Sequence, residues 1–168
     1  DHLSGKNVTD RLESAWDRLG DKLAPMDRRT LRLMLSAHLP ADGALRVASE
    51  VYEDASRSND DPAARHAAAR MAEAHRQLGN PSEAGRCALV AWGFGADAPT
   101  LDIDHPNLCL LVYRSARFAG DEETAKAALN SGIEWLCRAL PNVPESFRDS
   151  FRTRNPVNLE LLSYTASM

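Results

Sequence analysis

Two 21-residue stretches decide the fold, MAEAHRQLGNPSEAGRCALVA (residues 71–91) and VYRSARFAGDEETAKAALNSG (residues 112–132). Each carries a glycine at its ninth position, followed by small residues at helical spacing, so that Ala84 aligns with Ala125, 41 residues later. Two antiparallel helices approach closely only where side chains are short, and a glycine can reverse the chain between them. The repeat therefore predicts an all-α fold of stacked antiparallel helix pairs.

A fainter copy surrounds Ala44, 40 residues before Ala84, with Leu39 in place of the glycine. Apolar residues at helical spacing, together with proline, glycine and aspartate at the breaks, extend the pattern over the chain. Asp61 is predicted to cap the helix that follows the first pair. Helices are predicted at about residues 10–24 (on Leu12, Trp16, Leu19 and Leu23), 27–38, 42–55, 62–78, 81–92, 106–119, 122–139, 144–153 and 156–162. We expect one domain over residues 1–168, with helix pairs at about 28–57, 62–92 and 106–139 and capping helices at 144–166.

Residues 28–139 resemble the tetratricopeptide repeat, which places a large apolar and then a small residue on its first helix, glycine at the turn, and alanines on its second helix. The period of 40–41 residues departs from the usual ~34. The resemblance implies a superhelix whose first helices line a concave groove for a partner peptide. Matching its groove positions residue by residue gives Arg29, Leu33, Ser36, His66, Ala69, Glu73, Arg76, Asn107, Leu110, Arg114 and Arg117.

Arginines outnumber acidic residues in this groove set, which favours an acidic or phosphorylated peptide or protein partner. The alternative is that these arginines only keep the helix surfaces soluble, each beside a side-chain partner one helical turn away on the same helix. A different function class stays open as well, a small-molecule sensor with a pocket formed between the repeats and the irregular stretch 93–104, near Trp92 and Phe94.

The C-terminal stretch FRDSFRTRNPVNLELL (residues 147–162) mixes arginines with acidic residues, which disfavours nucleic-acid contact. Its phenylalanines, Phe147 and Phe151, are predicted to be buried against the helix of Trp135. Residues 143–162 resemble the PExFRxSFLxRNPVNxxLL motif of large bacterial signalling proteins, with Arg152 in place of the leucine. That resemblance implies a regulatory helical-repeat region of a larger bacterial ATPase-containing signalling or transcription regulator.

Bulk composition narrows the function classes. The 168 residues have a net charge of -4, which gives no general attraction to nucleic acid or to an anionic membrane. No apolar run approaches the ~20 residues that span a bilayer. Cys87, Cys109 and Cys137 form no CxxC pair and lie in apolar contexts, which predicts three buried thiols and a cytoplasmic protein.

No catalytic signature is present. The chain lacks HExxH, GxSxG and a phosphate-binding glycine loop, so we expect a non-enzyme, although an unrecognised site stays an alternative. His66 and His75 lie nine residues apart on one predicted helix, ~13 Å along its axis, too far to share a metal. The run Asn59–Asp61 lacks the ligand spacing of an EF-hand. The sequence therefore predicts no metal and no cofactor.

Overall fold

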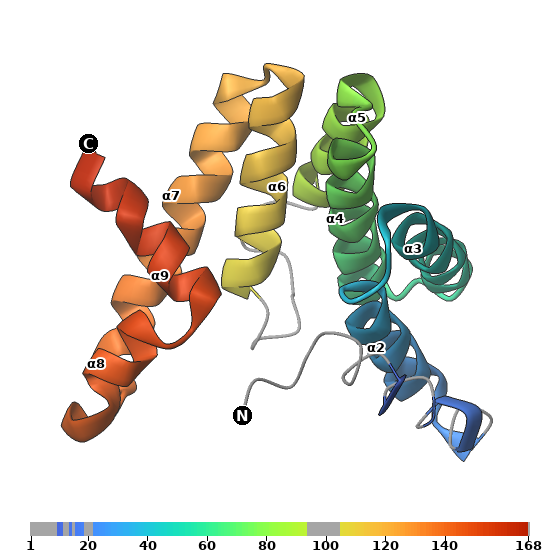
Figure 1. Ribbon diagram of the computed structural model, residues 1–168, viewed down its shortest axis with the longest axis horizontal. Helices are drawn as coiled ribbons and strands as arrows, with labels where there is room; N and C mark the ends of the chain where they lie inside the picture. The colour runs from blue at the N-terminus through green and yellow to red at the C-terminus, as the bar shows by residue number, and fades with distance from the viewer. Residues whose placement is uncertain (1–9, 12–13, 15, 19–21, 94–104, 168) are drawn as a thin grey trace.

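The structure is a computed structural model that describes residues 10–11, 14, 16–18, 22–93 and 105–167. Within these residues the secondary structure is entirely helical, as predicted, and Figure 1 shows the helices packed side by side along the chain. The helices are α2 (Pro25–Ser36), α3 (Ala41–Arg57), α4 (Asp61–Gln77), α5 (Pro81–Gly93), α6 (His105–Ala119), α7 (Glu122–Ala139), α8 (Glu145–Thr153) and α9 (Pro156–Ser163). Short 3-10 segments follow α7 (Leu140–Asn142) and α9 (Tyr164–Ser167).

The first predicted helix falls largely outside the described residues, Leu12 and Leu19 among them. Its described residues 10–11, 14 and 16–18 are helical. The irregular stretch predicted at 93–104 also lies outside them, apart from Gly93, which is the last residue of α5. In the described part of the chain, no helix is long and apolar enough to cross a membrane.

The turns between helices use the chemistry that the sequence predicts. Gly79 and Gly120 adopt positive φ angles of 76° and 83°, which glycine reaches without a steric penalty. Beyond each glycine a backbone N–H bonds back into the preceding helix, from Asn80 to the His75 carbonyl and from Asp121 to the Ala116 carbonyl, both at 2.9 Å. This is the bond pattern of a Schellman C-cap. The two turns are therefore structural copies, 41 residues apart.

Side-chain caps begin the helices that follow. Asp121 Oδ1 accepts from the Thr124 N–H, and Asn155 Oδ1 accepts from Val157 and Asn158, as predicted. The prediction that Asp61 caps α4 is wrong by one residue, because Asp60 Oδ1 accepts from Ala63 at 3.3 Å. Asn59 has a left-handed φ of 53° and completes the chain reversal one residue earlier.

Small residues fill the helix contacts. Each helix from α2 to α7 packs on the next one, and α4 also packs on both α2 and α6. The alanines at which α4, α5 and α7 meet their neighbours, among them Ala72, Ala84, Ala88 and Ala128, are fully buried. Helices α5 and α6 approach closely at Gly85, where an added Cβ would lie 2.7 Å from Ala119 Cβ.

The C-terminal end is closed by α9, not by α8. Helix α9 packs against α6 and α7 (Figure 1), and its Leu161 is fully buried beside Gly132. Phe151 is half-buried against this core, as predicted, but the burial predicted for Phe147 is wrong, because that side chain is 62% exposed. Only the C-terminal end of α8 reaches the core, where Asn158 donates a hydrogen bond to the Phe151 carbonyl at 3.0 Å.

Candidate functional site

The sequence-predicted groove residues divide into a buried set and a surface set. Arg29, Leu33, Ser36, His66, Ala69, Glu73 and Leu110 are buried, and Asn107 is half-buried. Arg29 is held by side chains of the α3–α4 turn, since it donates to Asp54, Ser58 and Asp60, each at 2.7 Å. The buried residues therefore stabilise helix contacts in the folded chain, and the surface set is what a partner could reach.

We call a group of four charged residues the charged face: buried Glu73 and half-buried Arg76 of α4, half-buried Arg114 of α6 and half-buried Glu160 of α9. Arg76 donates to both carboxylate oxygens of Glu73, at 2.7 and 2.8 Å. Arg114 binds Glu160 in the same bidentate geometry. Its Nε donates to Oε1 at 2.9 Å, and a terminal guanidinium nitrogen donates a second hydrogen bond to Oε2. The first pair lies within α4, and the second joins α6 to α9. The two pairs are close enough for the charge of Arg114 to act on Glu73 and that of Glu160 to act on Arg76.

The pKa values of this face follow from its geometry. Burial alone would raise the pKa of Glu73, but the hydrogen bonds from Arg76 and Gln77 and the charge of Arg114 outweigh burial and lower it. The hydrogen bond to Glu73 raises the pKa of Arg76, and the charge of Glu160 adds to this effect. Glu73 and Arg76 therefore stay ionised at neutral pH.

Aromatic side chains border the charged face. Tyr113 and Tyr164 pack edge to face with their ring centroids 4.9 Å apart. Arg117, which is exposed, donates to the Tyr113 hydroxyl at 2.7 Å. The arginines that the sequence placed on α6, Arg114 and Arg117, therefore lie on one surface, and Arg114 already holds a carboxylate.

A second cluster, His105, Cys109 and Ser131, places a thiol beside an imidazole as in a catalytic pair, but its thiol is buried. His105 Nε2 lies 3.4 Å from Cys109 Sγ and 3.2 Å from Ser131 Oγ. Cys109 is fully buried, and burial raises the pKa of its thiol to about 11, which leaves almost no thiolate at neutral pH. This cluster packs the α6–α7 contact.

The three thiols should differ sharply in reactivity. Cys87 and Cys109 are buried as predicted, whereas the burial predicted for Cys137 is wrong, because that residue is exposed on α7. We expect a maleimide reagent to label one thiol per native chain rapidly, at Cys137, and all three only in denaturant. Mass spectrometry of the digested protein measures this, and fast native labelling of Cys109 would contradict the buried packing.

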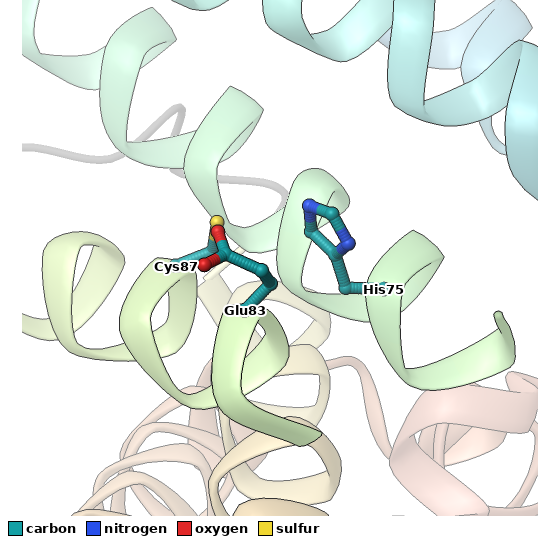
Figure 2. Close-up of side chains that lie close together, drawn as sticks. All are labelled: His75, Glu83 and Cys87. Atoms are coloured by element: carbon teal, nitrogen blue, oxygen red, sulfur yellow. The ribbon is translucent and has the colours of Figure 1, made fainter. Parts of the chain in front are cut away.

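The third cluster joins His75 at the end of α4 to Glu83 and Cys87 of α5. One potential ligand atom from each residue lies within 4.8 Å of those of the other two. Figure 2 shows the Glu83 carboxylate beside the Cys87 sulfur, with the His75 imidazole facing them from the neighbouring helix. Cys87 is buried, and burial raises the pKa of its thiol, while Arg86 acts in the opposite direction.

Sequence reasoning missed this third cluster, although its signal is local. Glu83 and Cys87 are four residues apart and share one helix face, and His75 precedes Glu83 by eight residues across the glycine turn. A hairpin with a Schellman turn at Gly79 brings the last turn of α4 against the first turns of α5. The spacing H-x7-E-x3-C across that turn could therefore have predicted the cluster.

A hollow that is open to solvent lies at the C-terminal end of α7. Its volume is about 360 Å³, and it is lined by Trp135, Arg138, Ala139 and Asn142. The predicted small-molecule site near Trp92 and Phe94 involves residues 94–104, which lie outside the described part of the chain.

Comparisons of the chain with protein-family models, curated proteins and solved structures gave no match.

Proposed function

We propose that this chain is a non-catalytic protein-interaction domain of tetratricopeptide-like helix pairs, whose charged face binds an acidic segment of a partner protein. The observation that carries the proposal is the Arg114–Glu160 pair, in which α6 already binds a carboxylate presented by another segment. A guanidinium that binds one carboxylate in bidentate geometry can bind another carboxylate or a phosphate in the same way. The wider role, as a regulatory region of a bacterial signalling protein, rests on the C-terminal motif.

The charged face is accessible enough for such binding. The side chains of Arg114 and Glu160 are 34% and 30% exposed, and that of Arg76 is 33% exposed. Exposed Arg117 lies one helical turn from Tyr113 and extends the positive surface along α6. In this proposal an incoming acidic segment takes the place of Glu160 on Arg114, so that α9 acts as an internal competitor.

Two substitutions at one ion pair test the proposal. Arg114→Gln and Glu160→Gln remove the same half-exposed pair, so each should lower the free energy of unfolding by less than about 1 kcal/mol. Their effects on binding should be opposite, because Glu160→Gln frees the guanidinium and Arg114→Gln removes it. For a fluorescent peptide of alternating glutamate and phosphoserine, we expect Kd to fall for Glu160→Gln and to rise by about tenfold for Arg114→Gln, or about 1.4 kcal/mol.

Fluorescence anisotropy at fixed salt measures these Kd values, since exposed ion pairs are screened by salt. Arg152→Gln on α8 is the matched control, because Arg152 is an exposed arginine outside the charged face and should leave Kd unchanged. Binding that weakens equally in Arg152→Gln and Arg114→Gln would show a nonspecific charge effect. No binding of the peptide by Glu160→Gln would reject the charged face as the site.

A further inference from the structure

We propose that His75, Glu83 and Cys87 form a binding site for a divalent transition-metal ion, with Zn²⁺ as the fitting ion. An imidazole nitrogen, a carboxylate oxygen and a thiolate sulfur are the three ligand types that Zn²⁺ takes in proteins. A thiolate also disfavours Mg²⁺ and Ca²⁺, which prefer oxygen ligands alone. Three protein ligands leave a fourth position for water or for a group from a partner.

The internal repeat shows that these three side chains are not part of the common packing scheme. Shifted by 41 residues, His75, Glu83 and Cys87 align with Ala116, Thr124 and Ala128 of the next helix pair, all buried. Shifted by 40 residues in the other direction, they align with Leu35, Gly43 and Val47. Both neighbouring copies fill the positions with residues that contribute no strong metal ligand, and only the middle copy places ligand types at all three.

The local geometry leaves these ligands available. The Nδ1 atom of His75 is buried and has no hydrogen-bond partner, so a cation bound there would supply the partner that the protein lacks. Both hydrogen bonds from Arg86 go to Oε2 of Glu83, at 2.7 and 3.0 Å, which leaves Oε1 for a metal. Arg86 therefore positions the carboxylate without covering it.

The distances fit a site whose ligand atoms move closer together when the ion binds. Zn²⁺ bond lengths of about 2.0–2.3 Å place tetrahedral ligand atoms roughly 3.3–3.6 Å apart. The three atoms lie within 4.8 Å of one another, and the Glu83 side chain is 45% exposed and can turn inward. Binding would release the Cys87 thiol proton to solvent and join α4 to α5 across the Gly79 turn, which should stabilise the pair.

The experiment uses Co²⁺ as a visible substitute for Zn²⁺. Titration of the chelator-treated full chain with Co²⁺ should give a thiolate-to-cobalt charge-transfer band in the near ultraviolet that saturates at one equivalent and disappears when Zn²⁺ is added. Zn²⁺ should also raise the melting temperature, because an ion that binds only the folded chain stabilises it.

Variants decide which residues bind the ion. Loss of an outer-shell partner alone typically weakens metal binding by about 10–100-fold, so His75→Gln, Glu83→Gln and Cys87→Ser should each weaken Zn²⁺ at least tenfold. Cys87→Ser should also abolish the charge-transfer band. Cys137→Ser removes an exposed thiol on α7, and His38→Gln removes an exposed imidazole in the turn after α2. Both are matched controls, with no expected change.

Glu83→Gln keeps the test decisive if the other variants fail to fold, because the Glu83 side chain is 45% exposed and its loss should leave the helical circular dichroism unchanged. A band that persists in Cys87→Ser, or that is lost in Cys137→Ser, would overturn the site. Zn²⁺ affinity unchanged in a folded Glu83→Gln protein would overturn it too.

Discussion

Replacement of Arg29 by methionine should lower the free energy of unfolding by about 2–4 kcal/mol, a loss typical of removing a buried guanidinium that donates several charge-assisted hydrogen bonds. Methionine preserves most of the apolar stem, so the loss reports the guanidinium. That group is buried and donates to Asp54, Ser58 and Asp60. Without it, the α3–α4 turn keeps two neighbouring carboxylates with no cation between them. Urea denaturation followed by circular dichroism measures the change.

Arg57→Met is the control for this substitution. Arg57 lies 4.0 Å from the same Asp54 carboxylate, but its side chain is 76% exposed. An exposed pair contributes less than about 1 kcal/mol, so the two variants separate burial from charge. Equal losses in Arg29→Met and Arg57→Met would contradict the structural role that we assign to Arg29.

The contact between Arg29 and Asp54 should make the free energy of unfolding depend on pH. The hydrogen bond from Arg29 lowers the pKa of Asp54 below its ordinary value of 3.8, more than burial raises it. A carboxyl group with a lowered folded-state pKa contributes stability that is present above the unfolded pKa and is lost as pH falls through the folded one. The wild-type chain should therefore lose this contribution below about pH 4, and Arg29→Met should lack that part of the acid dependence.

The helices were predictable because their ends carry local chemistry. The glycines at 79 and 120 and the caps Asp121 and Asn155 act within a few residues of the chain, and all four predictions are confirmed. The exposure of Cys137 could also have been predicted from the sequence. The buried stripe of α7 runs through Ala125, Ala128, Leu129, Gly132 and Leu136, and Cys137 lies one residue off it.

The candidate sites depend on contacts that no local pattern encodes. Arg114 and Glu160 are 46 residues apart, and their pairing requires that α9, not α8, lies on α6. The groove residues taken from the repeat resemblance include side chains such as Leu33 and His66 that the helix contacts bury. A consensus position fixes the face of a helix, whereas the distance between neighbouring helices decides whether that face is open.

Gly85→Ala should destabilise the domain by about 1–3 kcal/mol, the usual cost of overpacking, although alanine is the better helix former. A Cβ at Gly85 would lie 2.7 Å from Ala119 Cβ, closer than real Cβ atoms approach, and neither methyl group can rotate away. Helix α5 must therefore move from α6. Gly43→Ala is the matched control, since its new Cβ would lie 3.5 Å from Leu39 Cβ, an ordinary contact. That helical substitution should be neutral or stabilise by up to ~1 kcal/mol.

A second substitution identifies the contact responsible. Ala119→Gly removes the opposing methyl group, so the double variant Gly85→Ala/Ala119→Gly exchanges the two partners and restores the close approach of α5 and α6. We expect a favourable coupling energy of about 0.5–3 kcal/mol in the double-mutant cycle, the range found for residues in direct contact. Additive losses would mean that the cost of Gly85→Ala arises elsewhere.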